Sequence, residues 1–289
     1  MATIVVTGGS SGVGLAAAKR FAARGDEVIL VGRDPDRLAT AVAETTAAAK
    51  AGGTTTAAKA GETTATTGAE ETKTVESFRA DFENLAEVRA LAASLKGRRI
   101  DVLANNAGGM VGEYRRTPDG FEATIQSNHL APFLLTTLLR EELRDARVVN
   151  TASRAHMRGV PDPARLQGDP AKYSSWSAYS AAKAANILFA AEAARRWPDV
   201  LSVSFHPGVV RTNFGAGRVT RFFYRYAPFL VTPEEAGDLL VWLATAPADR
   251  LTNGAYYVGR DKPATPAAHA RSAGLAARLW DTSAEAVEE

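Results

Sequence analysis

The sequence predicts an α/β fold in which one doubly wound parallel sheet of about seven strands carries helices on both faces. Three observations predict it. Short β-branched or apolar runs alternate with longer segments of helical periodicity. A glycine-rich turn joins the first run to the first helical segment. The 289 residues, 46% hydrophobic and 23% charged, suit a single domain over residues 1–289, in which we find neither a second domain nor an internal repeat.

The chain begins with two strand–helix pairs. Residues 4–7 form a β-branched run that ends at glycine, and residues 15–24 place apolar side chains at helical spacing until Gly25. A second apolar run, 27–31, precedes a helix predicted over residues 36–50. Strand, helix, strand, helix is typical of parallel strands joined by crossover helices.

The alternation then breaks, because residues 51–73 are almost entirely Ala, Thr, Gly, Lys and Glu. Such a composition cannot pack a core, so we interpret 51–73 as a low-complexity surface insertion. A docking arm is the alternative interpretation of the same residues.

After the insertion, short apolar runs and segments of helical spacing alternate again. The predicted elements are, in order, strand 75–80, helix 85–95, strand 100–104, helix 121–143, strand 147–151, helix 176–197, strand 201–205, helix 233–245 and strand 255–258.

Charge and composition exclude several classes of function. The net charge is +2, and basic residues are interleaved with acidic ones, so we expect no nucleic-acid partner. The absence of cysteine excludes disulfides, cysteine nucleophiles and thiolate metal sites, and it suits a cytoplasmic enzyme. The first residues, Met1 to Thr7, lack the features of a signal peptide, and no segment is apolar for long enough to span a membrane.

The turn after the first strand reads Thr7-Gly8-Gly9-Ser10-Ser11-Gly12-Val13-Gly14. Glycines let backbone N–H groups approach a pyrophosphate, and the following helix N-terminus favours anions. The spacing G-x-x-x-G-x-G differs from the usual dinucleotide fingerprint, and a purely structural turn is the alternative. Its position favours a single-domain Rossmann fold with a dinucleotide site that uses Gly8, Ser10, Ser11, Gly12, Val13 and Gly14.

The end of the second strand indicates which dinucleotide is bound. Enzymes that use NAD usually place an acidic residue there, whereas this chain has Gly32 followed by Arg33. The planar guanidinium of Arg33 suits a 2′-phosphate, so NADP(H) is the preferred cofactor and NAD(H) stays open. A solvated Arg33 in a loop is the alternative.

The helical stretch 176–197 contains Tyr179-Ser180-Ala181-Ala182-Lys183. Positions i and i+4 lie on one face of a helix, so the phenol and the ammonium come within reach of each other. A nearby ammonium favours the phenolate and lowers the pKa of a tyrosine, which makes it a better general acid or base. Alone, however, the pattern is common.

The pattern is accompanied by others, and the chain from Thr3 to about Tyr257 resembles the short-chain dehydrogenase/reductase family. The matching motifs stand in the family's order and are Thr7 to Gly14, Asp81, Asn105-Asn106-Ala107-Gly108, Asn128, Ser153, Tyr179 with Lys183, and Pro207-Gly208 with Thr212.

The resemblance implies roles at the matching positions. Ser153 would orient the substrate oxygen, and Tyr179 would exchange the proton. Lys183 would hold the nicotinamide ribose and lower the tyrosine pKa, and Asn128 would break a helix locally and hold a water. For the cofactor, the resemblance implies adenine contact by Asp81, a wall shaped by Asn105, carboxamide contact by Thr212, and further contacts from Phe82, Ala107, Gly108, Pro207, Gly208 and Val210. No metal is expected.

The chain is more closely similar to the retinol dehydrogenase and WW-domain oxidoreductase branch of that family. The similarity is carried by Val31 to Asp34, Ser153 to His156, Ala178 to Lys183 with Ala185-Asn186, and Thr232 to Glu235. It implies lipophilic alcohols and carbonyls as substrates, often with NADP(H). The chain lacks the N-terminal membrane anchor of animal retinol dehydrogenases and carries an insertion near Thr54, which argues against retinoid as the substrate.

An aromatic cluster at 222–230 falls in residues 211–231, where this family varies its substrate lid. We interpret it as a lid over an apolar ketone, aldehyde or secondary alcohol. Packing in the core or between subunits, and contact with a membrane surface, are the alternatives.

His206 is interpreted as a packed residue, and His156 either packs or lines the substrate pocket. A cofactor-binding regulator without turnover is the alternative function, and assembly into a homo-oligomer is left open.

Overall fold

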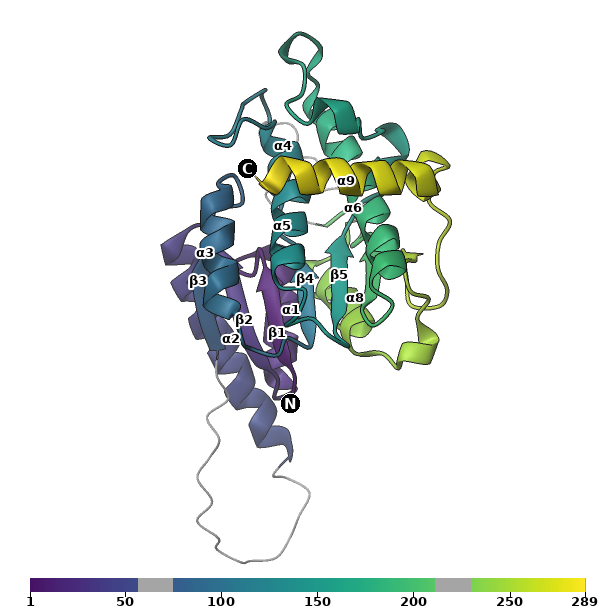
Figure 1. Cartoon of the computed structure of the whole chain (residues 1–289). Coiled ribbons are helices and arrows are strands. Elements are labelled where there is room, and N and C mark those ends of the chain that lie inside the picture. Colours follow the sequence, from purple (N-terminus) through teal and green to yellow (C-terminus); the bar gives the residue numbers. More distant parts are fainter. Residues whose placement is uncertain (57–74, 211–229, 289) are drawn as a thin grey trace, which may run out of the picture.

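The structure is a computed structural model, and it describes residues 1–56, 75–210 and 230–288 (Figure 1). Within these residues a seven-stranded parallel sheet forms the centre of the molecule, in the order β3-β2-β1-β4-β5-β6-β7. The strands are β1 (Thr3–Thr7), β2 (Glu27–Gly32), β3 (Val75–Arg79), β4 (Val102–Asn105), β5 (Arg147–Thr151), β6 (Leu201–Phe205) and β7 (Tyr256–Tyr257). The predicted doubly wound parallel sheet is therefore confirmed.

Helices cover both faces of the sheet. On one face α1 (Gly12–Ala23) contacts α2 (Pro35–Thr56) and α8 (Pro233–Thr245). On the other lie α3 (Leu85–Leu95), α5 (Ala131–Leu138) and α6 (Ser175–Arg196), and the short α4 (Ala123–Ile125) packs on α6. Consecutive residues of one strand serve both layers, since Val5 packs with the α3 side and Val6 with the α1 side. Burial of both faces explains why the strands are continuous apolar runs.

Helix α2 continues to Thr56, beyond its predicted end at Lys50 and into the predicted insertion. The reason is close packing against α1. A Cβ atom on Gly52 would lie 2.0 Å from the carbonyl oxygen of Ala23, so only glycine fits where the two helices meet. The remainder of the predicted insertion, from residue 57, lies outside the described residues.

The predicted helix 121–143 is interrupted. It consists of α4, a π-helical turn from Gln126 to Leu130, and α5, which ends at Leu138. The π turn carries Asn128, whose Nδ2 donates to the carbonyl oxygens of Thr124 at 2.9 Å and Gly109 at 2.8 Å. Insertions of this kind often mark functional sites. The departure from regular α-helix coincides with the local break expected at Asn128.

A helix that the sequence pattern did not predict, α9 (Ala273–Glu288), lies across α5 and α6 (Figure 1). The Trp280 ring packs between Phe133, Phe189 and Trp197, with centroid distances of 5.0, 5.6 and 5.0 Å. This helix therefore extends the apolar core on the α6 side of the sheet. None of the helices in the described part of the chain is both long and apolar enough to cross a membrane.

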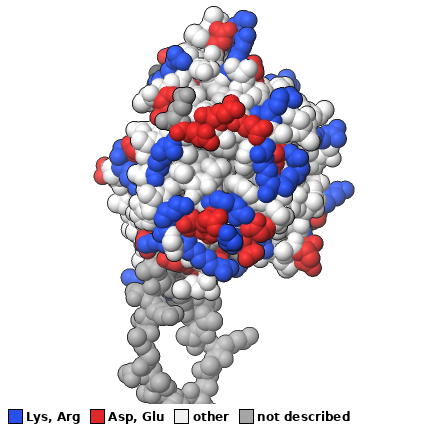
Figure 2. All heavy atoms as spheres, in the orientation of Figure 1, with Lys and Arg blue, Asp and Glu red and all other residues white. Residues whose placement is uncertain are grey.

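Acidic and basic side chains alternate on the face drawn in Figure 2, as the interleaved charges of the sequence predicted. Several of the exposed charges are paired. Lys19 lies 3.0 Å from Glu44, and Arg98 lies 2.9 Å from Glu76. Exposed pairs of this kind contribute little to stability.

Candidate active site

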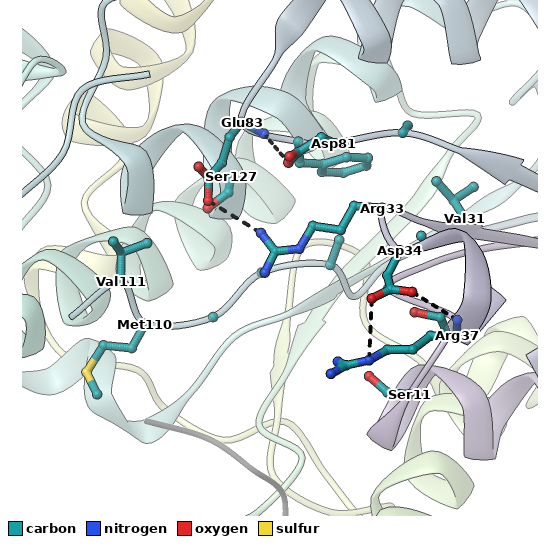
Figure 3. A pocket seen from close by; sticks show the side chains of 18 residues that line it. Ser11, Val31, Arg33, Asp34, Arg37, Asp81, Glu83, Met110, Val111 and Ser127 are labelled. Atoms are coloured by element: carbon teal, nitrogen blue, oxygen red, sulfur yellow. Dashed lines mark hydrogen bonds and ion pairs between the residues drawn. The ribbon is translucent and has the colours of Figure 1, made fainter. Parts of the chain in front are cut away.

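A cavity of about 390 Å³ opens at the carboxyl ends of β1, β2, β3 and β4 (Figure 3). The strand order reverses between β1 and β4, and this switch point is where ligands bind in open α/β sheets. The cavity is lined by Gly8, Ser10, Ser11, Val31, Gly32, Arg33, Asp34, Arg37, Ala80, Asp81, Phe82, Glu83, Ala107, Gly108, Gly109, Met110, Val111 and Ser127.

The glycine-rich turn forms one wall, and its shape depends on missing side chains. Gly8 adopts a φ of +65°, and a Cβ atom on Gly14 would lie 2.4 Å from the Gly8 carbonyl oxygen. The Thr7 Oγ1 atom accepts hydrogen bonds of 3.0 Å from the N–H groups of Asn106 and Ala107. The turns after β1 and β4 are thereby fixed against each other, which sets the width of the cavity.

The beginning of α1 is suited to an anion. Ser11 is the N-cap residue, but its side chain makes no capping hydrogen bond, and no acidic residue stands in the first turn. The first N–H groups of a helix lack intrahelical partners and carry partial positive charge. Together with the adjoining cavity, this donor set fits the pyrophosphate of a dinucleotide, with Gly12, Val13 and Gly14 supplying backbone rather than side chains.

Two arginines lie at the β2 end of the cavity (Figure 3). Arg33 was predicted, and its Nη1 atom lies 3.7 Å from Glu83 Oε1. Arg37 was missed, although it stands one helical turn beyond Arg33 at the beginning of α2. Its Nε atom lies 3.7 Å from Asp34 Oδ2. Two guanidinium groups beside the cavity fit an anionic group such as the 2′-phosphate of NADP(H).

Asp81 and Phe82, two of the candidate cofactor-binding residues, line the cavity from the loop after β3. The Asp81 carboxylate accepts the Glu83 N–H at 3.0 Å, and the Asp81 N–H donates to Glu87 at 3.0 Å. Phe82 is buried. The loop after β3 is therefore held rigidly at the edge of the cavity.

Tyr179 and Lys183 lie one turn apart on α6, and both are buried. The Lys183 Nζ atom lies 5.4 Å from the centre of the Tyr179 ring, so the predicted proximity is confirmed. Nζ donates to the Thr151 carbonyl oxygen at 3.2 Å, and Asn186 Nδ2 donates to the same oxygen at 3.0 Å. Burial lowers the pKa of Lys183 to about 7, because a charged ammonium is costly away from water.

Ser153 begins a short 3₁₀ turn, Arg154–Arg158, directly after β5. Its Oγ atom accepts the Ala155 N–H at 3.1 Å, which leaves the hydroxyl hydrogen to be donated elsewhere. His156 fixes the turn from the other side. Its Nδ1 atom lies 2.6 Å from the Ser153 carbonyl oxygen, and its Nε2 atom accepts the Ala267 N–H at 3.2 Å.

These contacts define the tautomer of His156. Because Nε2 accepts a hydrogen bond, the hydrogen of the neutral ring lies on Nδ1. The ring is 2% exposed, and burial lowers its pKa. Burial likewise lowers the pKa of His206 to about 4. Both histidines are buried, as the packing interpretation requires, and His156 is not among the residues that line the cavity at the ends of β1 to β4.

Asn128 braces the cavity from behind. Its Nδ2 atom donates to two carbonyl oxygens. Its Oδ1 atom lies so close to Gly108 that a Cβ atom on that residue would be only 2.4 Å away, and the φ of Gly108 is +133°. Gly108 and the neighbouring Ser127 both line the cavity. The Oδ1 atom is buried and has no hydrogen-bond partner within the described parts of the chain. Its expected role in holding a water stays a prediction.

Some predicted residues lie elsewhere. The Asn105 side chain donates to Thr136 and Asn150 at 3.0 Å each, so it joins β4, β5 and α5 beneath the cavity rather than forming its wall. Asn105 is the last residue of β4, and its side chain points toward α5. Pro207, Gly208 and Val210 follow β6 but do not line this cavity, and Gly208 packs on Val231. Thr212 and the predicted lid, apart from residues 230 and 231, lie outside the described residues.

Comparison with known sequences identifies the family. The model of the short chain dehydrogenase family matches residues 2–61 and 47–220. A protein of Streptomyces sp. (strain C5), provisionally named daunorubicin C-13 ketoreductase DnrU, is 47% identical over 99% of this chain and 92% of its own length. Human retinol dehydrogenase 11 is 33% identical over 98% of this chain and 84% of its own length.

Solved structures agree. A crystal structure of an uncharacterised protein from Mycobacterium Paratuberculosis superposes with a TM-score of 0.76 and 30% sequence identity, covering 100% of this chain and 94% of that one. A short chain dehydrogenase from Salmonella enterica shares the fold, with a TM-score of 0.65 and 22% identity over 89% and 95% of the two chains. The chain therefore belongs to the short-chain dehydrogenase family, whose members are oxidoreductases that use nicotinamide cofactors.

Proposed function

We propose that the protein is an NADP(H)-dependent reductase of bulky hydrophobic ketones and aldehydes, which also oxidises hydrophobic secondary alcohols to ketones. The observation that carries the proposal is the buried pair of Tyr179 and Lys183. Lys183 contacts the carboxyl end of β5, and the cavity opens at the carboxyl ends of β1 to β4 in the same parallel sheet. The provisional name of the Streptomyces relative, a ketoreductase, supports the same chemistry.

In the reductive direction, a bound reduced nicotinamide supplies hydride to the carbonyl carbon. Ser153 donates its hydroxyl hydrogen to the substrate oxygen, since its Oγ atom already accepts from Ala155. Tyr179 transfers its proton to that oxygen as the alcohol forms. The Lys183 ammonium, held by the Thr151 carbonyl oxygen, stabilises the phenolate that remains. Oxidation uses the same groups in reverse.

A carbonyl panel tests the proposal. Consumption of NADPH is followed by its absorbance with short and long 2-ketones, aromatic ketones, aldehydes, sugars and small hydroxy acids, with NADH in parallel. We expect turnover of the bulky apolar carbonyls with NADPH. If no compound causes NADPH consumption, the alternative function, a cofactor-binding regulator without turnover, is favoured.

Substitution of Arg33 by alanine tests the choice of cofactor. We expect NADPH binding to weaken about tenfold, because a charge-assisted contact to the 2′-phosphate is lost. NADH binding should change little. Dissociation constants from fluorescence titration measure both, and Arg116→Ala, which removes a nearby arginine that does not line the cavity, is the control. If both cofactors bind the variant as well as they bind the wild type, Arg33 is a solvated loop residue.

The surroundings of Tyr179 indicate an apolar substrate. Several large apolar residues of the described chain are exposed near the catalytic residues in the sequence. Met157 and Val160 follow Ser153, Trp176 precedes Tyr179, and Val209 follows β6. The Trp176 ring centre lies 6.3 Å from that of Tyr179. A bulky apolar substrate that covers the Trp176 ring would be stabilised by roughly 25 cal/mol per Å² of apolar area buried.

We therefore expect kcat/KM to rise with chain length across a series of 2-ketones and then level off. Trp176→Ala should flatten the rise while sparing NADPH binding, and Trp176→Phe, which retains an aromatic ring, should preserve it. Steady-state kinetics on the ketone series measure the slope. Faster turnover of small hydrophilic carbonyls would argue against the apolar substrate.

A further inference from the structure

An acidic side chain faces the proposed phosphate site. Glu83 lines the cavity from the loop after β3, opposite Arg33 (Figure 3). Its Oε1 atom lies 3.7 Å from Arg33 Nη1, and its Oε2 atom accepts a hydrogen bond from Arg115. Its side chain is only 13% exposed, whereas that of Arg33 is 68% exposed. The carboxylate thus lies between two guanidinium groups, one inside the cavity and one behind it.

The position of Glu83 is fixed by its neighbours. Its backbone N–H donates to the Asp81 carboxylate, and the next residue, Asn84, caps α3 through bonds to the N–H groups of Ala86 and Glu87. The hydrogen bond to Glu83 raises the pKa of Arg115, which therefore stays charged. A long flexible arginine, Arg33, can move, but the carboxylate opposite it is held in place.

A 2′-phosphate that binds Arg33 must compete with this carboxylate. Arg33 loses part of its ion pair with Glu83, and the incoming phosphate is repelled by the remaining negative charge. A cofactor without the 2′-phosphate leaves the ion pair intact and meets no such repulsion. Arg115 acts in the opposite sense, because its charge offsets that of Glu83 without entering the cavity.

We propose that Glu83 is a specificity-determining residue that reduces the preference for NADP(H) over NAD(H), and that Arg115 limits this effect. The inference rests on the proposed function in one respect, namely that the 2′-phosphate binds beside Arg33. It adds that the balance between the two cofactors is set by a carboxylate in the loop after β3, across the cavity from Arg33, which follows β2.

The test is the binding of adenosine 2′,5′-bisphosphate and of 5′-AMP, which differ only in the 2′-phosphate, measured by calorimetry and independent of turnover. Glu83→Gln keeps the shape of the side chain and removes its charge. We expect the ratio of the two affinities to shift toward the bisphosphate by about threefold to tenfold at low salt, and by less as salt screens the charges. Glu76→Gln, at the other end of β3, is the control and should leave the ratio unchanged.

A double-mutant cycle tests the part assigned to Arg115. Arg115→Ala should weaken the bisphosphate more than 5′-AMP, and this loss should be smaller when Glu83 is already glutamine. Arg116→Ala is the matched control for the lost charge. Equal losses in both backgrounds would show that Arg115 does not act through Glu83 and would overturn its assigned part.

A ratio that Glu83→Gln leaves unchanged, or shifts toward 5′-AMP, overturns the proposal, and the latter result would mean that Glu83 orients Arg33 for the phosphate. The proposed preference for NADP(H) is judged separately, from the wild-type ratio and from Arg33→Ala. If the wild type binds adenosine 2′,5′-bisphosphate and 5′-AMP equally well, that preference is wrong. Glu83→Gln should still shift the ratio of affinities toward the bisphosphate, because the repulsion between the carboxylate and the 2′-phosphate is removed.

Discussion

Replacement of Tyr179 by phenylalanine is expected to lower kcat by about 10²-fold or more, with the affinity for NADPH nearly unchanged. The phenyl ring can occupy the same buried position on α6, beside Trp176 and Lys183, so the packing of the site is preserved. Only the hydroxyl that would transfer the proton is removed. Steady-state kinetics with the best substrate of the carbonyl panel, together with fluorescence titration of NADPH, measure the two quantities.

Tyr114→Phe is the matched control. The Tyr114 hydroxyl donates to the Gln167 carbonyl oxygen at 3.0 Å in an exposed loop. Its removal should leave kcat within a few-fold of the wild type. Near-normal turnover of Tyr179→Phe would contradict the proposed mechanism, and a large loss of NADPH affinity would indicate that the hydroxyl holds the cofactor instead.

Most of the sheet and its helices could be predicted from the sequence, because each buried parallel strand is a short apolar run and each crossover helix has its own periodicity. The helix over 121–143 was predicted as continuous, since hydrophobic spacing does not reveal that the Asn128 side chain bonds to backbone carbonyls and forms a π turn. Helix α9 was missed although Leu275, Leu279 and Trp280 have helical spacing, because polar loops separate it from the alternating pattern.

The site shows a similar division. The glycine-rich turn and the pair of Tyr179 and Lys183 could be predicted, because each is formed by residues that lie close together in the sequence. The Thr151 carbonyl oxygen, which accepts from Lys183 and Asn186, is a backbone atom and leaves no trace in the residue type. Glu83 faces Arg33 only because β3 pairs with β2, a contact between residues far apart in the chain.

Lys183→Met is expected to lower kcat by about 10²-fold or more and, at the same time, to raise the thermal stability of the cofactor-free protein. Turnover falls because no ammonium remains to stabilise the phenolate of Tyr179. Stability rises because the buried ammonium, whose pKa burial lowers to about 7, is replaced by an apolar side chain of similar length. The Thr151 carbonyl oxygen keeps its bond from Asn186, so no new unpaired acceptor is created.

The pH dependence distinguishes this gain from a general packing effect. Between pH 7 and the usual lysine pKa of 10.5, unfolded Lys183 binds a proton that the folded state does not, so wild-type stability rises with pH. Below pH 7 both states bind the proton, and the cost of burying the charge has an upper limit on the order of 5 kcal/mol, which corresponds to the difference between a pKa of 10.5 and one of about 7. The difference in Tm between Lys183→Met and the wild type should therefore be largest at or below pH 7 and shrink as pH rises toward 10.5. Lys19→Met, which removes an exposed lysine paired with Glu44, should show neither the gain nor its pH dependence. A lower Tm for Lys183→Met that does not vary with pH would mean that the contact to Thr151 outweighs the cost of burying the ammonium.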